Sequence, residues 1–250
     1  MKFSVIMPAY MEEEGIEDAL EACENILVGF EAPYEIIVVD DGSDDKTSEK
    51  ACDYVSRHVK VIRCRENLGK GGAIREGFKH VTGDLVIFMD ADTDLQAAQI
   101  ECFLYHLSMD DADVVVGSKA HPLSQVNHPM FRRFSSHGYR FLNKVLFGLD
   151  VCDTGVGQKL FKREVLDDVM GGVLVKRHAF DLEILVSAHY RGYKVVEAPV
   201  KMNYDFFGCS VDFLAVLNVF VDVCLVFYRS RILRCYDRGK KGKNPVLGAG

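Results

Sequence analysis

The sequence lacks the cysteine pattern of a zinc site or of a disulfide-rich protein. None of its eight cysteines forms a C-x-x-C pair, and no cluster of histidines accompanies them. We therefore expect reduced, mostly buried thiols in a cytosolic protein. The sequence also lacks an excess of positive charge, because 30 basic residues face 37 acidic ones and leave a formal net charge of −7. This balance argues against a nucleic-acid ligand, which would require many basic contacts to phosphate groups.

Two common phosphate-binding motifs are absent as well. No G-x-G-x-x-G follows the first predicted strand, and the glycines around Lys70 do not have the spacing of a P-loop. These absences count against dehydrogenases and ATPases. The chain contains no internal repeat. Its first residues predict a strand rather than an export signal, because they carry neither a basic region nor a small-residue cleavage site.

The sequence does contain a regular alternation of apolar runs and amphipathic segments. Its 250 residues, 48% of them hydrophobic, can bury one large core or two small ones. The alternation is typical of an α/β fold with a largely parallel sheet covered by helices on both faces. Strands are predicted at 3–7, 35–39, 59–63, 85–89, 114–116 and 195–200, with one more at the end of a loop spanning 153–161. Helices are predicted at 16–27, 45–56, 72–81, 97–107, 131–147, 179–190 and 211–228.

Polar residues follow each of the first five predicted strands. In sheets of this kind, ligands bind at the carboxyl ends of the strands, so these residues are expected to line one rim. A loop at 119–129 with two prolines comes after the last of them, and its length is typical of a lid. The rim segments are 8–12 (PAYME), 40–43 (DDGS), 65–70 (RENLGK), 90–94 (DADTD) and 117–119 (GSK).

Three carboxylates, Asp90, Asp92 and Asp94, stand directly after the buried strand at 85–89. A divalent cation would relieve their mutual repulsion, since Mg²⁺ and Mn²⁺ prefer oxygen ligands and commonly bind one or two carboxylates together with diphosphate oxygens. Such an ion offsets the charge of a departing phosphate. The alternative is that these aspartates cap the helix that follows them.

An acidic pair and a lysine among glycines stand at two other strand ends. Asp40 and Asp41 can accept hydrogen bonds from a nucleobase or a ribose, although an Asp-Gly turn explains the same residues. Lys70 follows Gly69 and precedes two further glycines, which allow the backbone to approach an anion closely at the start of a helix. Taken alone, each of these two signals is weak.

In their order along the chain, these motifs resemble those of family 2 glycosyltransferases with the GT-A fold. The second half of the chain narrows the resemblance to the polyprenyl-phosphate (dolichyl-phosphate) hexose synthases. The segment 117–121 (GSKAH) is closer to the glucose branch than to the mannose branch, and the likeness covers about residues 2–231. The second-half motifs are 131–135 (FRRFS), 153–161 (DTGVGQKLF), 179–183 (AFDLE) and 197–200 (EAPV).

This resemblance implies a GT-A nucleotide-diphospho-sugar transferase fold, a nucleotide-sugar donor and transfer of a hexose with inversion. It also implies Mg²⁺ or Mn²⁺ held by Asp90 and Asp92, with Asp94 as a further ligand. The residues implied to bind the donor lie at the first four strand ends. They are Pro8, Ala9, Tyr10, Glu12, Asp40, Asp41, Gly69, Lys70, Asp90, Ala91 and Asp92.

The implied acceptor is a polyprenyl or dolichyl phosphate. A phosphomonoester has a second pKa of about 6, so near pH 7 it is already an anionic nucleophile and needs cations to position it rather than a general base. Lys119, Arg132 and Arg133 fit that task. Arg133 matches the family pattern and is predicted to be catalytic with Asp90 and Asp92. The alternative for the three basic residues is an ordinary solvated helix face.

The chain departs from the family pattern at two places. Met11 replaces the asparagine that usually precedes Glu12, and the segment 205–210 lacks the arginine and lysine that many relatives carry there. Four charged residues do match family positions, and both catalysis and buried ion pairing remain open for them: Asp153, Lys159, Asp181 and Glu183.

The predicted helix at 211–228 is the most apolar segment of the chain, yet it carries Asp212 and Asp222. Two internal aspartates disfavour a bilayer span, because each is costly near the membrane centre. An amphipathic helix in the membrane interface fits better. Seven basic residues against one aspartate at 229–250 would be attracted to anionic headgroups. A core helix and a homodimer contact are the alternatives.

We therefore predict a GT-A domain at 1–204, a membrane-interface helix at 205–231 and a basic, flexible tail at 232–250. The predicted activity is transfer of a hexose, with glucose from UDP-glucose preferred, to a polyprenyl phosphate by a peripheral enzyme on the cytoplasmic face of a membrane. Homo-oligomers are compatible with this prediction. The alternatives are GDP-mannose as donor, a saccharide acceptor, a nucleotidyltransferase, and a non-catalytic module that binds nucleotide sugars.

Overall fold

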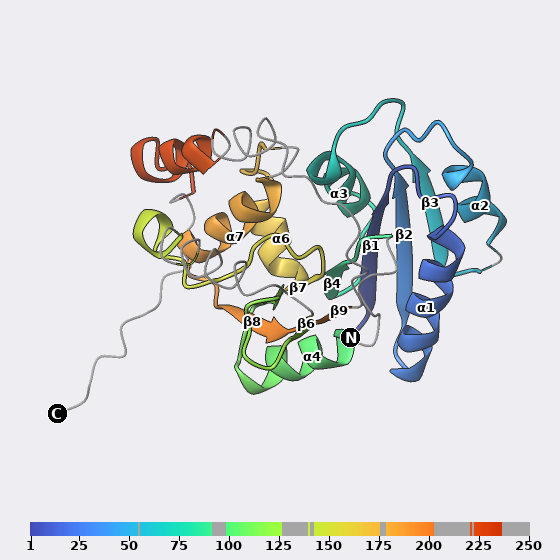
Figure 1. Cartoon of the computed structure of the whole chain (residues 1–250), viewed down its shortest axis with the longest axis horizontal. Helices are drawn as coiled ribbons and strands as arrows, with labels where there is room; N and C mark the ends of the chain where they lie inside the picture. The colour runs from blue at the N-terminus through green and yellow to red at the C-terminus, as the bar shows by residue number, and fades with distance from the viewer. Residues whose placement is uncertain are drawn as a thin grey trace.

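The computed structural model describes residues 1–54, 56–91, 99–126, 140, 143–175, 179–202, 221 and 223–236. Its centre is a seven-stranded sheet with the order β3-β2-β1-β4-β7-β5-β8 (Figure 1). Only β7 runs antiparallel to its neighbours β4 and β5, so the predicted, largely parallel sheet is confirmed. The strands are β1 (Phe3–Ala9), β2 (Tyr34–Asp40), β3 (Val59–Arg63), β4 (Leu85–Phe88), β5 (Val114–Ser118), β7 (Lys159–Lys162) and β8 (Val195–Pro199).

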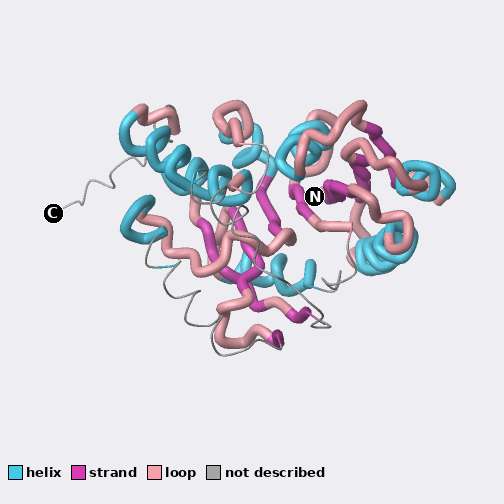
Figure 2. The backbone as a smooth tube through the Cα atoms, turned by 45° about the horizontal axis from the view of Figure 1, so that its top comes forward, coloured by secondary structure: helices cyan, strands magenta, loops and turns pink. Residues whose placement is uncertain are grey.

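Helices cover both faces of this sheet, as expected from strands that are apolar throughout (Figure 2). Side chains alternate along β1, so Ile6 packs in one core while Val5 and Met7 pack in the other. The core that contains Ile6 lies under α3 (Lys70–Phe78), α6 (Arg163–Val169) and α7 (Phe180–Tyr190). The opposite core lies under α1 (Ile16–Gly29), α2 (Thr47–Asp53) and α4 (Gln99–Met109).

Several element boundaries differ from the sequence prediction for local reasons. Helix α2 begins at Thr47 rather than at 45, because the Asp45 carboxylate accepts the Thr47 backbone N–H at 3.0 Å and lies before the helix. Helix α3 begins at Lys70, directly after Gly69, whose φ of +77° is outside the helical region. Helix α6 and the short parallel pair β6 (Gln125–Val126) and β9 (Lys201–Met202) were not predicted.

Two predicted helices fall largely outside the described residues. Of 131–147, residues 140 and 143–147 are described and helical, and of 211–228, residues 221 and 223–227 are helical before a short π-helical turn at Tyr228–Ile232. The predicted loop from 153 leads into β7, as expected. No helix within the described ranges is long and apolar enough to cross a membrane.

The thiols do not follow the expectation of general burial. Among the seven cysteines in the described part of the chain, all are free and only three are buried. Cys52 and Cys224 are exposed, because they lie on the solvent-facing sides of their helices. The buried ones are Cys23, Cys64 and Cys152.

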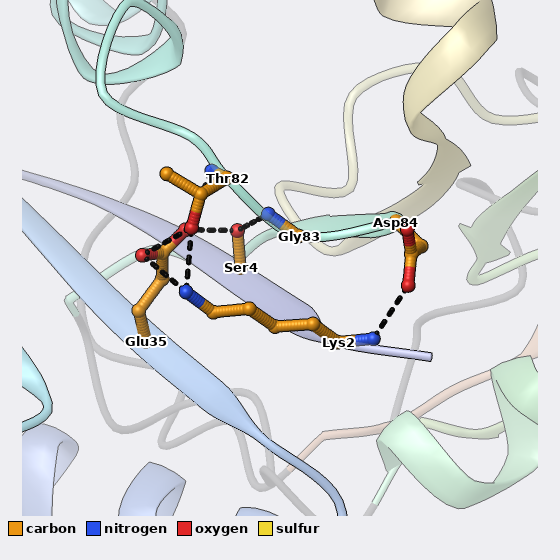
Figure 3. A network of polar contacts seen from close by, with 6 residues as sticks. All are labelled: Lys2, Ser4, Glu35, Thr82, Gly83 and Asp84. Carbon is orange, nitrogen blue, oxygen red and sulfur yellow. Dashed lines mark hydrogen bonds and ion pairs between the residues drawn. The ribbon is translucent and has the colours of Figure 1, made fainter.

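A polar network lies at the end of the sheet where β1 and β2 begin (Figure 3). The Glu35 carboxylate accepts hydrogen bonds from the Lys2 ammonium at 2.9 Å and from the Thr82 backbone N–H at 2.7 Å. It also accepts the Ser4 hydroxyl, whose oxygen in turn accepts the Gly83 N–H at 2.8 Å. These bonds lower the pKa of Glu35 to about 2 despite the opposing effect of burial. The network stabilises the end of the sheet opposite the predicted rim.

Candidate active site

A pocket of about 220 Å³ opens at the carboxyl ends of the first strands. It lies where β1, β2 and β4 end and where α3 begins, which is the position expected for a ligand site in a parallel sheet. Eight of its nine lining residues were predicted to bind a nucleotide-sugar donor. The lining residues are Pro8, Ala9, Tyr10, Glu12, Asp41, Lys70, Ala73, Asp90 and Ala91.

The Asp90 carboxylate and the Lys70 ammonium form an ion pair inside this pocket. Lys70 Nζ lies 2.6 Å from Asp90 Oδ1 and 2.9 Å from Oδ2, so both oxygens face the ammonium. The two side chains are 30% and 26% exposed, respectively, so solvent reaches both. Gly157 leaves the space that this carboxylate fills, because a Cβ atom there would lie 1.7 Å from Asp90 Oδ2. Asp90 is therefore held from two elements that are distant in sequence.

A second ion pair lies behind the first and is buried. Lys159 Nζ, at the start of β7, is 2.7 Å from Asp181 Oδ1 at the start of α7, and the lysine side chain is completely buried. Burial lowers the pKa of Lys159, and the positive charge of Lys70 lowers it further, whereas Asp181 and Asp90 raise it. The ammonium groups of Lys70 and Lys159 are thus close enough to interact.

Close packing of α3 on α7 brings these two ion pairs together. Gly71 lies against the ring of Phe180, and a Cβ atom at Gly71 would come within 2.5 Å of that ring. The amino-terminal ends of α3 and α7, which carry Lys70 and Asp181, are therefore neighbours. The sequence pointed to Lys159 and Asp181 only through the family resemblance, because nothing in local spacing indicates that two charged residues are buried together.

The other acidic residues of the pocket have raised pKa values. Burial raises the pKa of Glu12, and the carboxylates of Asp45 and Asp90 raise it further. Burial also raises the pKa of Asp41, although its carboxylate accepts the Leu68 backbone N–H at 2.8 Å. Adding the negative charge of a nucleotide to this pocket would therefore require compensating cations.

The two aspartates after β2 have different positions. Asp41 lines the pocket, whereas Asp40 is fully buried and is not part of the lining. Asp40 Oδ1 accepts the Ser43 backbone N–H at 2.9 Å, and its Oδ2 lies 3.5 Å from Arg63 Nε. Asp40 thus shapes the turn that presents Asp41, in agreement with the alternative of an Asp-Gly turn.

Lys119 follows the end of β5 and is not among the residues that line the pocket. Its backbone N–H donates to Asp153 Oδ2 at 3.3 Å. The backbone N–H of Asp153 in turn donates to Glu197 Oε1 at 3.2 Å, and the Cys152 N–H donates to the same oxygen at 2.8 Å. These bonds tie the Lys119 backbone to the loop before β7. Arg132 and Arg133 lie outside the described residues.

Glu183 is a structural anchor rather than a pocket residue. It is completely buried on α7 and accepts the backbone N–H groups of Leu174 and Val175 at 2.8 Å and 2.7 Å. It also accepts the Arg229 guanidinium and the Tyr236 hydroxyl. Burial and the Glu183 carboxylate raise the pKa of Tyr236 above its ordinary value. For Glu183, the alternative of buried ion pairing therefore explains the residue.

Asp90 is the predicted cation ligand that the described residues place in the pocket. Its carboxylate oxygens are of the kind that a divalent cation binds, and they lie in a space left by Gly157. Asp92 and Asp94, the other predicted ligands, lie outside the described residues. Within the part of the chain that is described, no three metal-ligating side chains cluster.

The mostly parallel sheet, with a pocket at the carboxyl ends of its strands, has the GT-A fold of glycosyltransferases. Its fold matches crystal structures of glucosyl-3-phosphoglycerate synthase from Mycobacterium tuberculosis in complex with UDP (TM-score 0.68, 20% identity, 94% of this chain and 80% of that one). It also matches mannosyl-3-phosphoglycerate synthase from Rubrobacter xylanophilus (TM-score 0.70, 15% identity, 94% and 75%). Residues 4–170 match the family described as Glycosyl transferase family 2, and the chain belongs to that family.

Curated relatives share more of the sequence. The human dolichyl-phosphate beta-glucosyltransferase is 33% identical over 250 aligned residues, which cover 93% of this chain and 76% of the relative. The enzyme of the same description from Drosophila melanogaster is 33% identical over 217 residues, covering 80% and 67%. Dolichol-phosphate mannosyltransferase from Pyrococcus furiosus is 34% identical over 205 residues, covering 80% of this chain and 56% of the relative. These likenesses confirm the predicted family and enzyme class.

Proposed function

We propose that this glycosyltransferase moves glucose from UDP-glucose to a polyprenyl or dolichyl phosphate, with inversion, at the cytoplasmic face of a membrane. The observation that carries the proposal is the pocket in which Asp41, Glu12, Lys70 and Asp90 meet at one rim. The relatives described as dolichyl-phosphate beta-glucosyltransferases support the choice of glucose and of a lipid phosphate.

The donor nucleotide would lie against the pocket wall formed by Pro8, Ala9 and Tyr10, with Asp41 as a hydrogen-bond acceptor. Asp90, with Asp92 and Asp94, would hold Mg²⁺ or Mn²⁺. When bound, such a cation offsets the charge that develops on the departing nucleoside diphosphate. Lys70 stands at the first residue of α3, where its ammonium and the backbone N–H groups of the first helical turn can both face a diphosphate. Neighbours crystallised with Mn²⁺ and UDP-glucose support this assignment.

The need for a general base distinguishes the two kinds of acceptor. A hydroxyl acceptor needs a base to take its proton. A phosphate is ionised near pH 7 and needs no base. We propose that Lys119, Arg132 and Arg133 position this phosphate, with Arg133 acting on the reacting group.

The end of the chain would place the enzyme at the bilayer. Val221, Leu225, Tyr228 and Ile232 are each between 47% and 61% exposed and recur at intervals of three or four residues. Such a stripe suits a helix that lies in the membrane interface, next to basic residues that attract anionic lipids. We therefore keep a GT-A domain at 1–204, an interface helix at 205–231 and a basic tail at 232–250 as the proposed organisation.

A donor and acceptor panel tests this function. The intact chain is incubated with UDP-glucose or GDP-mannose, Mg²⁺ or Mn²⁺, and either a short polyprenyl phosphate or a saccharide. We expect glucosyl lipid phosphate and UDP as products, with the Asp90→Asn variant inactive. Formation of mannosyl lipid phosphate would show that the donor is GDP-mannose, and formation of a glycosylated saccharide would show that the acceptor is a saccharide. Release of pyrophosphate would indicate a nucleotidyltransferase, and binding without turnover would contradict catalysis.

A further inference from the structure

The two ion pairs at the pocket differ in whether solvent and ligands can reach them. Lys159 and Asp181 form a pair whose lysine side chain is 0% exposed and whose aspartate side chain is 10% exposed, so water and solutes cannot reach the ammonium. Lys70 and Asp90 are 30% and 26% exposed, and both line the pocket. The first pair is therefore fixed by its surroundings, whereas the second can exchange partners with a ligand.

The Lys70 ammonium contacts the carboxylate oxygens of Asp90 that a divalent cation would bind. It lies within 2.9 Å of both carboxylate oxygens, and the same carboxylate fills the space that a Cβ atom at Gly157 would take. A divalent cation on those oxygens would stand next to a positive charge and would be repelled by it. The Lys159 ammonium is also close, since the charges of both Lys70 and Asp90 act on it. Asp90 therefore cannot be fully available to a divalent ion while Lys70 stays in place.

The position of Lys70 gives it an alternative partner. It is the first residue of α3, where backbone N–H groups favour an anion, and its flexible side chain can turn without moving the helix. A nucleoside diphosphate in the pocket would offer oxygens within reach of the same ammonium. We propose that Lys70 is an exchangeable counter-ion. It neutralises Asp90 in the donor-free enzyme and moves to the diphosphate when donor and divalent cation bind, so that the two ligands bind cooperatively. This inference rests on the proposed nucleotide-diphosphate donor.

The first test measures binding of Mn²⁺ alone to the full chain by titration calorimetry. Lys70→Met is compared with Lys79→Met, which removes the same charge from the exposed end of the same helix. We expect Lys70→Met to bind Mn²⁺ about tenfold more tightly than the wild type and Lys79→Met to be unchanged. The gain in Mn²⁺ affinity must disappear in the double variant Lys70→Met, Asp90→Asn, because the proposal attributes the gain to release of the Asp90 carboxylate. Equal Mn²⁺ affinity in Lys70→Met and wild type would overturn the proposal.

The second test determines whether the Lys70 ammonium moves to the diphosphate or only repels Mn²⁺ from its position on Asp90. With saturating Mn²⁺, UDP should bind Lys70→Met about tenfold more weakly than the wild type, whereas uridine, which has no phosphate, should bind both equally. Unchanged UDP affinity, or an equal loss for UDP and uridine, would show that Lys70 does not move to the diphosphate. If UDP binds none of the variants, the proposed donor is wrong, while the Mn²⁺ titration still decides whether Lys70 competes for Asp90. Lys70→Gln provides a second variant, and thermal unfolding verifies that each variant is folded.

Discussion

Glu183 and Arg229 are 46 positions apart in the sequence and form a buried ion pair between α7 and the last described helix. Arg229 also donates to the Gly172 carbonyl oxygen at 2.7 Å, and its guanidinium lies over the ring of Tyr236. The segment that we propose to face the membrane is thus attached to the domain that holds the pocket. Cutting the chain before this segment would remove the Arg229 guanidinium and the Tyr236 hydroxyl from the buried Glu183 carboxylate, so membrane binding is better tested on the intact chain.

Glu183→Gln should destabilise the protein by about 3 kcal/mol, because it leaves Arg229 buried without its charged partner. Urea unfolding measures the loss as a lower midpoint. Glu17→Gln is the matched control, since Glu17 pairs with Lys50 at 4.0 Å on the surface and should change stability by less than about 1 kcal/mol. Similar midpoints for the two variants would contradict an anchoring role for Glu183.

Gly157→Ala should lower the catalytic rate about 100-fold, because its Cβ atom would displace the Asp90 carboxylate from the pocket. Steady-state kinetics with the donor and acceptor that prove active measure this loss. Gly171→Ala is the control, since no atom lies within 4 Å of the position of its Cβ. A fully active Gly157→Ala enzyme would mean that the position of Asp90 is not critical.

Met11→Asn should stabilise the protein by about 0.5–1 kcal/mol, since Met11 has φ of +59° and asparagine tolerates this left-handed conformation better than methionine. Thermal unfolding should show a higher midpoint. Met109→Asn, at an exposed helical position, should show no gain, and a gain there of equal size would argue against the conformational explanation.

Lowering the pH should remove stability that comes from Glu35. Its pKa is about 2 in the folded protein against 4.5 as the ordinary value, so the carboxylate stabilises the fold fully above pH 4.5. That contribution, about 2 kcal/mol after allowance for solvent screening, should be lost as the pH falls from 4.5 toward 2. Glu35→Gln should flatten the dependence of unfolding free energy on pH in this interval, whereas Glu31→Gln, which is exposed, should not.

Membrane binding should depend on the exposed stripe of the last helix. Replacing Leu225 and Ile232 by glutamate should abolish flotation of the intact chain with phosphatidylserine vesicles, because it places charge on the apolar face. Val28 and Met109 are exposed apolar residues on other helices, and their double replacement by glutamate is the control. Equal flotation of both double variants would place the membrane contact elsewhere.

Much of this fold could be predicted because its strands are buried on both faces. The continuous apolar runs that became β1, β2 and β4 end in polar residues, and the parallel order of the sheet places those ends together. Helix α6 and the pair β6 and β9 were missed because they are short, and their formation depends on contacts between distant segments.

The candidate site could likewise be predicted only in part. Family motifs placed Asp41, Lys70 and Asp90 at one rim, and the pocket brings them together. The sequence could not distinguish Asp40 from Asp41, because only the folded chain decides which of these two buried carboxylates lines the pocket. The partners of Lys159 and Glu183 were also not predictable, since each pair joins elements that meet only in the folded chain.

The amino-acid sequence by itself determined the fold class, the family and the set of polar residues at the strand ends, because these depend on local periodicity and on motifs that are contiguous in the chain. The tertiary structure alone decided which charges are paired. It placed the Lys70 ammonium on Asp90 and buried Lys159 against Asp181, because the ionic partners are chosen by the packing of α3 and α7 against the sheet rather than by sequence spacing.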